Sequence, residues 1–352
     1  MKSISLFVMM LISTIAFAKI WIVDSNPGST AKDFTNLQAA HDGAAAGDTL
    51  YLIGSPINYI TTKVTVTKKL VIIGPGFFLN ENVDTQANVL SAFIDNTTPG
   101  VCEELEFAPG SEGSVLMGVK ILGYMAVNTD NILIRRNHFK QEYLCEKSTV
   151  IINGSNVLFN QNFVEGSPGA SPSTGIVFIT AGKSGVIVGN NYLHHACSGC
   201  GGGAIALNSA STSSVEVFNN IFYGGIIVFN ATVQNNLFRT SNTMTFTSSV
   251  VRNNSASAGV FLPAGNNNES NVDGFSTAFV GTGSTDGRWQ LTATSIFKGT
   301  GVGGVDRGMF GGVEPYILSG IPPIPTIYSL TAPAIGEKNT GLPIQLKVKS
   351  NN

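Results

Sequence analysis

The feature that most constrains the fold is a short phrase that recurs with no helix-sized segment between its copies. An apolar triplet, a polar turn and a variant of V-x-V-x-N-N-x-F follow one another repeatedly between residues 105 and 256. Each unit contains two short apolar segments of strand length and repeats at an irregular step of roughly 16–29 residues, which is typical of a solenoid. An α/β fold would need a longer, usually helical crossover between parallel strands. The second half of the phrase reads ILIRRNHF (132–139), VLFNQNFV (157–164), VIVGNNYL (186–193), VEVFNNIF (215–222), TVQNNLF (232–238) and SVVRNNSA (249–256).

We therefore predict an all-β protein, a single-stranded right-handed parallel β-helix whose strands pair with their copies in adjacent coils. The second asparagine of each phrase follows an apolar residue by three positions, so these amides are expected to stack about 4.8 Å apart inside a bend. They would then hydrogen-bond up and down a structural ladder formed by Asn137, Asn162, Asn191, Asn220, Asn236 and Asn254.

The residues that follow the ladder are expected to alternate between the interior and the surface. The inward apolar stack would consist of Phe139, Val164, Leu193, Phe222 and Phe238. The residues directly after each ladder asparagine face outward and form a candidate docking stripe of Phe163, Tyr192, Ile221 and Leu237.

The first 18 residues have the form of a signal peptide. Lys2 precedes an apolar run that ends in Ala16-Phe17-Ala18, a small-x-small cleavage signal. The run is shorter than the ~20 residues that cross a bilayer, and no comparable run follows, so no transmembrane span is expected after cleavage. We predict a secreted protein, located in the periplasm or on the outer cell surface, whose β-helix spans residues 19–312.

Both ends of this coil carry recognisable segments. DFTNLQAAHDGAAAGDTLYLIG (33–54) predicts a short amphipathic capping helix, a Gly47-Asp48 turn and a strand. It resembles the start of secreted proteins of the pectate-lyase-like superfamily. WQLTATSIFKGTGVGGVDRGMFGG (289–312) resembles the closing coil of secreted β-helix proteins of the Bacteroidetes type. The resemblance covers most of residues 20–312 and implies the same fold, but it matches no characterised enzyme family, and fold alone does not decide activity.

The scarcity of acidic residues in the middle coils argues against several enzyme mechanisms of that superfamily. Residues 127–130 (VNTD) imitate a first polygalacturonase motif, but its companion motifs are absent, and no aspartate occurs between Asp130 and Asp273. Hydrolases and methylesterases need carboxyl pairs, and calcium-dependent lyases need several carboxylates around the ion. A lyase that uses Arg, His, Tyr or Lys remains open.

The densest polar patch is RRNHFKQEYLCEK at residues 135–147. As a ligand surface it would supply an arginine for an acidic sugar and a histidine or tyrosine for acid-base work. The alternative is a solvated face that keeps a weakly charged protein soluble. The candidate ligand-surface residues, with those of neighbouring coils, are Arg135, Arg136, His138, Lys140, Glu142, Tyr143, Glu165, His194 and His195.

The four cysteines lie in or near loops. HHACSGCGGG (194–203) reads as an inserted surface loop, for which a local Cys197–Cys200 disulfide, a zinc site and a redox site are alternatives. In a secreted chain we favour the disulfide or two loop-pinning thiols, and we predict no metal and no cofactor. Cys102 and Cys145 lie about two coils apart, ~9.6 Å, beyond the ~4.4–6.8 Å between Cα atoms that a disulfide spans, unless the 140–147 loop folds across the coil.

Residues 313–352 form a Pro-rich C-terminal extension. The run GIPPIP (320–325) is extended, and TIYSLTAP and PIQLKVKS alternate like the two strands of a hairpin. Because an isolated hairpin is marginal in water, we expect it to dock on the coil, join a partner or attach the protein to the cell envelope.

With a net charge of −2 and no charge block, the chain is not expected to bind nucleic acid. We predict a secreted or cell-surface protein with a non-catalytic binding or structural role and a polysaccharide or cell-envelope component as its partner. One alternative is a polysaccharide lyase or glycoside hydrolase that acts through residues 135–165. A metal-dependent role of the His-Cys loop is the third hypothesis.

Overall fold

A computed structural model describes residues 18–95, 103–141, 148–166, 175–195, 204–239, 243–336 and 341–351. The four cysteines, Glu142, Tyr143 and residues 1–17 of the expected signal peptide lie outside these ranges, so the predictions about them stay predictions. Within the described part, no helix is long and apolar enough to cross a membrane.

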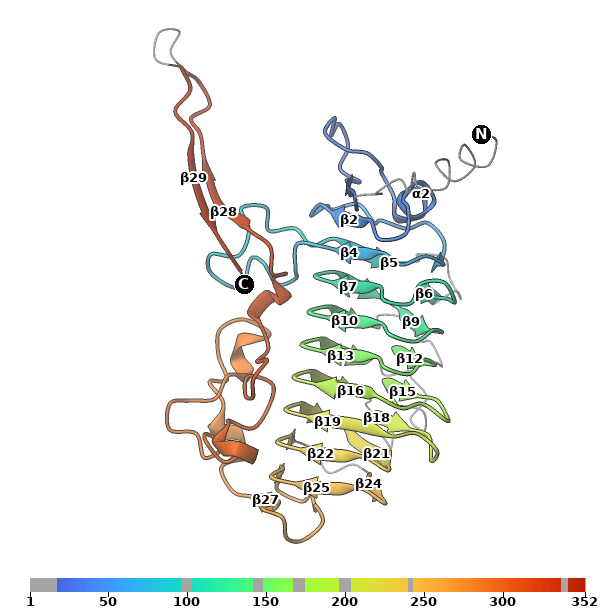
Figure 1. Ribbon diagram of the computed structural model, residues 1–352. Coiled ribbons are helices and arrows are strands. Elements are labelled where there is room, and N and C mark those ends of the chain that lie inside the picture. Colours follow the sequence, from blue (N-terminus) through green and yellow to red (C-terminus); the bar gives the residue numbers. More distant parts are fainter. Residues whose placement is uncertain are drawn as a thin grey trace, which may run out of the picture.

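The chain winds into a right-handed parallel β-helix with three strands in each complete coil (Figure 1). The two halves of the V-x-V-x-N-N-x-F phrase are separate strands joined by a bend at the asparagines, so the unit holds three strands and not the two expected. Sheet 1 contains β1 (Ile20–Val23), β2 (Thr49–Leu52), β4 (Val71–Ile73), β7 (Val115–Met117), β10 (Leu133–Arg135), β13 (Leu158–Asn160), β16 (Val186–Gly189), β19 (Val215–Phe218), β22 (Thr232–Gln234) and β25 (Val250–Arg252).

The other two sheets complete each coil, and neighbouring strands within them are parallel, most of them without a shift in register. Sheet 2 contains β5 (Phe93–Asp95), β8 (Lys120–Leu122), β11 (His138–Lys140), β14 (Phe163–Gly166), β17 (Tyr192–His195), β20 (Ile221–Tyr223), β23 (Leu237–Phe238), β26 (Ser255–Ser257) and β27 (Glu269–Val272). Sheet 3 contains β3 (Val64–Val66), β6 (Glu103–Phe107), β9 (Tyr124–Val127), β12 (Val150–Ile152), β15 (Val177–Ile179), β18 (Ile205–Ser209), β21 (Gly225–Phe229) and β24 (Met244–Thr247).

A short helix closes the first coil, as the sequence predicts. Helix α2 (Leu37–Gly43) begins after Asn36, whose side chain accepts a hydrogen bond from the Ala39 backbone N–H at 2.8 Å. Leu37 and Ala40 are buried against the apolar interior. Strand β1, which precedes this helix and pairs with β2, is an addition to the predicted elements.

The six ladder asparagines stand in one buried column between sheets 1 and 2, and Asn268 extends the column by one coil. Each side-chain Nδ2 donates to the Oδ1 of the next asparagine at 2.9–3.2 Å. The same Oδ1 atoms also accept a backbone N–H, and each Nδ2 reaches a carbonyl of the preceding coil. The apolar stack of Phe139, Val164, Leu193, Phe222 and Phe238 is fully buried beside it.

The segment after the last coil does not close the β-helix, which corrects the expectation for residues 289–312. Residues 275–321, which we call the strap, run back along the outside of sheet 2 (Figure 1). Thr300 contacts Asn253, Met309 contacts Asn190, and Ile321 contacts Arg136. The strap therefore runs along the β-helix from its last coils toward its first. Its helical turns are four short 3-10 segments, η1 (Phe275–Ala278), η2 (Gly287–Trp289), η3 (Val302–Gly304) and η4 (Leu318–Gly320).

The strap covers the outward stripe of sheet 2. Phe163, Tyr192, Ile221 and Leu237 are buried in a second apolar cluster together with strap residues Phe275, Ala278, Phe279, Trp289, Phe297, Met309 and Tyr316. The stripe is therefore a docking surface, but its occupant is the strap and not the C-terminal hairpin.

The C-terminal hairpin consists of β28 (Thr326–Thr331) and β29 (Gln345–Lys349), an antiparallel pair that projects from the body (Figure 1). Its contacts with the rest of the chain are made near its base, where Ala87 N–H donates to the Ile327 carbonyl at 2.8 Å. The expectation that the hairpin docks on its own coil is thus not met.

Candidate functional site

A line of polar side chains runs along the outer face of sheet 2. The residue three positions after each ladder asparagine points outward, and the strand register places Lys140 beside Glu165, Glu165 beside His194, and His194 beside Tyr223. Arg239 continues the line, since its N–H donates to the Phe222 carbonyl at 2.9 Å. We call Lys140, Glu165, His194, Tyr223 and Arg239 the polar column.

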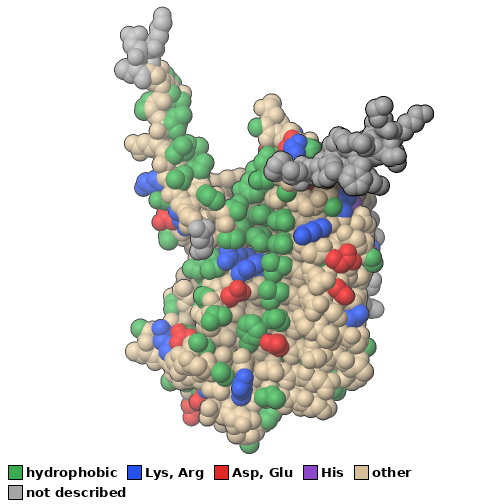
Figure 2. Space-filling view, in the orientation of Figure 1, with side chains coloured by type: hydrophobic (Ala, Val, Ile, Leu, Met, Phe, Trp, Pro, Cys, Tyr) green, Lys and Arg blue, Asp and Glu red, His purple; other side chains and the backbone are tan. Residues whose placement is uncertain are grey.

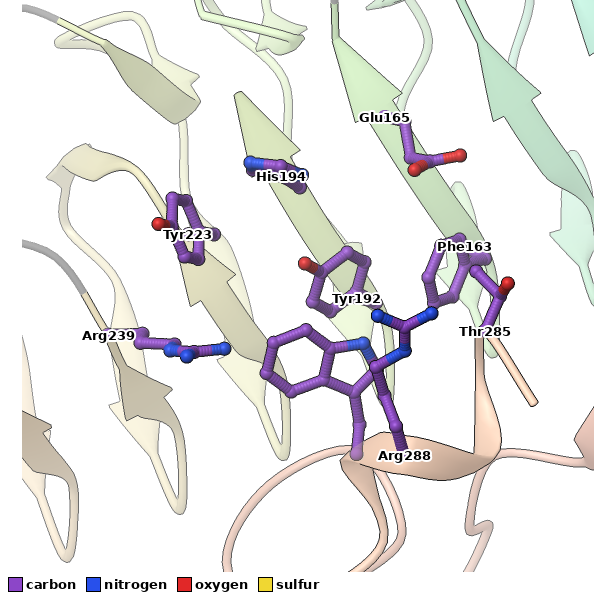
Figure 3. A pocket seen from close by; sticks show the side chains of 9 residues that line it. Phe163, Glu165, Tyr192, His194, Tyr223, Arg239, Thr285 and Arg288 are labelled. Carbon is purple, nitrogen blue, oxygen red and sulfur yellow. The ribbon is translucent and has the colours of Figure 1, made fainter. Parts of the chain in front are cut away.

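A pocket of about 300 Å³ opens between this column and the strap (Figure 3). The column supplies partly exposed side chains, and the strap residues Thr285, Arg288 and Trp289 supply the opposite wall. Basic, acidic, aromatic and hydroxyl groups therefore meet in one cavity, which is lined by Phe163, Glu165, Tyr192, His194, Tyr223, Arg239, Thr285, Arg288 and Trp289.

Stacked aromatic rings form a rigid back wall. The Tyr192 ring stacks on Phe163 with 4.4 Å between centroids, and Trp289 lies 4.8 Å from Tyr192 on its strap side. The Arg239 guanidinium lies 4.8 Å from the Trp289 ring and 5.5 Å from Tyr223, within the range of a cation–π contact. These contacts hold Arg239 at the pocket wall.

Glu165 is oriented from behind by His138. The His138 Nε2 and a Glu165 carboxylate oxygen are 2.8 Å apart, and the His138 side chain is 3% exposed. Burial lowers the pKa of His138, which favours the neutral ring, so its Nε2–H donates to the carboxylate. Burial alone would raise the pKa of Glu165, but the hydrogen bond from His138 and the charge of Lys140 lower it.

His194 and Tyr223 form the centre of the open side of the pocket. Their rings meet edge to face with 4.4 Å between centroids (Figure 3). Burial lowers the pKa of His194, although the nearby Glu165 opposes that shift. Burial raises the pKa of Tyr192, so the hydroxyl at the back wall stays protonated. The neutral imidazole of His194 can accept a proton, and the adjacent Tyr223 phenol can donate one.

The structure divides the candidate residues predicted from the sequence. Glu165 and His194 line the pocket, and Lys140 stands next to Glu165 in the polar column. His138 is buried behind Glu165, against the rings of Phe77 and Phe78. His195 is buried too, and its Nδ1 pairs with the Ile205 carbonyl at 3.0 Å.

Arg135 and Arg136 serve the attachment of the strap. The buried Arg136 guanidinium donates to the Gln161 side chain and to the strap carbonyl of Ile321, both at 2.8 Å. Arg135 donates to Gln161 at 2.9 Å and lies 3.8 Å from the Glu314 carboxylate. Because Arg136 and His138 are covered, the interpretation of this patch as a solvated face is wrong for them.

Sequence reasoning missed Tyr223, Arg239 and the strap residues Thr285, Arg288 and Trp289. Tyr223 and Arg239 could have been predicted, because each stands three positions after a ladder asparagine, where the alternation of side chains along a strand points them outward. The strap residues carry no such signal. Within the part of the chain that the structure describes, no group of three or more His, Cys, Asp or Glu side chains is placed to hold a metal ion.

Comparisons with known proteins identify no family for this chain and find only distant structural similarity. No protein-family model and no curated protein matches the sequence. Among solved structures, the chain is similar to pectate lyase Pel9A with a TM-score of 0.45 and 13% identity, over 84% of this chain and 97% of that chain. A rhamnogalacturonan lyase gives a TM-score of 0.29 and 13% identity, over 68% of each chain. The expected parallel β-helix is confirmed by the sheet pairings, and these distant similarities carry no argument.

Proposed function

We propose that this chain is a secreted or cell-surface protein that binds an acidic polysaccharide in the pocket between sheet 2 and the strap. The observation that carries the proposal is the convergence of two arginines, Arg239 from the coil and Arg288 from the strap, on a cavity whose described lining has one carboxylate, Glu165. Two guanidinium groups against one carboxylate favour an anionic ligand, and their planar forks match the geometry of a carboxylate.

The remaining side chains suit a sugar. A pyranose ring presents apolar faces and a rim of hydroxyl groups, so it is held by aromatic surface together with hydrogen-bonding groups. The partly exposed Tyr223 and His194 offer both, and Thr285 adds a hydroxyl on the opposite wall. The polar column follows the axis of the β-helix, which provides contacts along a linear polymer.

The test is binding of a polyuronate and of a neutral polysaccharide to the full chain, measured by calorimetry. We expect the polyuronate to bind and Arg239→Ala to weaken its affinity by about tenfold or more, as loss of a charge-assisted contact does. Arg252→Ala is the matched control, because Arg252 lies on sheet 1 and bonds only Gln234 among the hydrogen bonds described for its side chain. Equal effects of the two substitutions, or equal binding of both polymers, would contradict the proposal.

A second candidate function, a polysaccharide lyase, is favoured by the contact between His194 and Tyr223 beside Arg239. Arg239 would pair with the uronate carboxylate and acidify the adjacent C–H. Neutral His194 would take that proton, a C=C double bond would form, and the C–O bond to the leaving sugar would break. The Tyr223 hydroxyl would protonate the departing oxygen and later regain its proton from His194 through solvent.

The lyase leaves a product that distinguishes it from a hydrolase. It creates unsaturated sugar ends with ultraviolet absorbance, and both His194→Ala and Tyr223→Phe should abolish them while weakening polyuronate binding less than Arg239→Ala does. A hydrolase needs two carboxyl groups at the site, whereas the described pocket lining provides only Glu165. New reducing ends without unsaturation would contradict the lyase, and no new ends at all would leave binding as the function.

A further inference from the structure

Exposed apolar side chains gather at one end of the molecule. Of 17 large hydrophobic residues that are exposed in the described part, 11 lie on the projecting hairpin or on the loops beside its base. Such a concentration marks an interaction surface rather than the scattered apolar residues of an ordinary surface. The hairpin, which we call the arm, carries Ile327, Leu330, Ile335, Leu342, Ile344, Leu346 and Val348, and the loops carry Ile57, Val83, Val89 and Leu90.

The arm has one apolar face. Ile327 pairs with Val348 and Leu330 pairs with Leu346, and an irregularity between Ile327 and Ser329 brings both pairs to the same side. These four side chains are 45–64% exposed. A two-stranded ribbon is marginally stable alone in water, so a face of this kind needs a cover.

An apolar groove of about 410 Å³ lies beside the base of the arm. The loop that forms one wall also holds the arm, through the hydrogen bond from Ala87 N–H to the Ile327 carbonyl. The arm extends away from its own body and carries hydrophobic side chains along its length (Figures 1 and 2). None of the described residues that line the groove belongs to the arm. The groove is lined by Ser55, Pro56, Asn80, Val89, Leu90, Ser91, Phe93, Lys120 and Leu122.

The charges of the arm and of the wall loop have opposite signs. The charged side chains described on the arm are both basic, Lys347 and Lys349. The wall loop, residues 75–92, contains two charged residues, and both are exposed acids, Glu81 and Asp84. Lys120, which lines the groove, would repel the two lysines of the arm, so the electrostatic attraction comes from the acids of the wall loop.

We propose that two copies of this chain exchange arms, each arm laying its apolar face in the groove of the other copy. One chain carries both halves of the contact, and the arm's base adjoins the groove, so a two-fold axis repeats the same contact twice and closes the assembly. The apolar face and the groove then cover one another. This proposal is independent of the polysaccharide site, which lies farther along sheet 2.

The experiment measures the mass of the full chain in solution at micromolar concentrations by light scattering, with small-angle scattering for shape. We expect a dimer, and we expect Leu346→Asp on the arm or Leu90→Asp in the groove to raise its dissociation constant by about tenfold or more. Val313→Asp is the control, since Val313 is 95% exposed on the strap, away from both surfaces. Melting curves establish that each variant is folded.

Mixing the two defective variants tests the exchange itself. The groove of the Leu346→Asp chain is intact and accepts the intact arm of the Leu90→Asp chain, so the mixture should recover dimers that neither variant forms alone. A monomeric wild-type chain would overturn the proposal. A dimer that is insensitive to Leu90→Asp would mean arm-to-arm pairing, and arm-dependent binding of the monomer to lipid vesicles would mean a membrane partner, so either result would overturn it too.

Discussion

The two residues of each Asn-Asn pair perform different structural roles. The first residue turns the chain with a left-handed backbone, φ 53° at Asn190 and 53° at Asn219, a conformation that asparagine tolerates better than most residues. Its side chain therefore points outward, toward the strap. The second residue points inward and enters the ladder, so one dipeptide bends the coil, links it to the next coil and anchors the covering segment.

Asn191→Leu should destabilise the coil strongly. The Asn191 Oδ1 accepts two hydrogen bonds from Asn162, and its Nδ2 donates to the Phe159 carbonyl and to Asn220. Leucine supplies neither donor nor acceptor, and each buried polar group left unpaired costs about 1–3 kcal/mol. Chemical denaturation should show a lower free energy of unfolding by at least one such amount.

The control for this substitution is Glu216→Leu. Glu216 is exposed on β19, outside the buried ladder, and the same leucine there should change stability by no more than about 0.5 kcal/mol. If the two variants unfold at the same denaturant concentration, the buried amide column does not contribute as argued.

At the scale of elements, the strap is held by side chains of the coil as much as by apolar packing. Asn190 donates to the Met309 and Gly311 carbonyls, and Asn219 donates to the Asp306 and Gly308 carbonyls, at 2.7–3.3 Å. An irregular segment has few backbone partners of its own, so these amides satisfy carbonyls that would otherwise be buried unpaired.

Replacing Asn190 and Asn219 together by glycine should loosen the strap and leave the coil intact. Glycine keeps the left-handed backbone but removes the amide, and each lost hydrogen bond is worth about 0.5–1.5 kcal/mol. Hydrogen exchange of strap amides from Arg307 to Tyr316 should speed up, while β13 and β16 keep their protection. Asn156→Gly is the matched control, because Asn156 also has a positive φ but bonds Asn131. Unchanged exchange in the strap would contradict this role.

The coil was predictable from the sequence because its rules are local and repeated. An inward asparagine every coil, followed by an inward apolar residue two positions later, fixes the register of sheet 2, and the same alternation places Tyr223 and Arg239 outward. The strap follows no period, so neither its path nor the contact of Trp289 with Tyr192 can be inferred from spacing. One strand of each coil was missed because the V-x-V-x-N-N-x-F phrase was interpreted as a single strand, whereas it forms two strands joined by a bend at the asparagines.

At the scale of the whole molecule, the candidate site exists only after the chain has returned on itself. Glu165, His194, Tyr223 and Arg239 come from four successive coils, whereas Arg288 and Trp289 arrive with the strap from beyond the last coil. The stability of the strap and the occupancy of the pocket are therefore coupled, and a ligand that bridges the two walls should stabilise the folded chain as a whole.

Buried and partly buried histidines make the stability of the whole molecule depend on pH. Burial lowers the pKa of His138, His194 and His195 from 6.5, so below that pH the unfolded chain binds more protons than the folded chain. The free energy of unfolding must then decrease as the pH falls from 6.5 toward the folded pKa values. Glu165 acts in the same direction below 4.5, because its folded pKa is also lowered.

The melting temperature should therefore be lower at about pH 5.5 than at about pH 7.5, where the three rings are neutral in both states. His138→Gln should reduce the difference between the two pH values, because glutamine can still donate to Glu165 but does not titrate in this range. A melting temperature that is constant or rises on acidification would show that these rings do not become harder to protonate on folding.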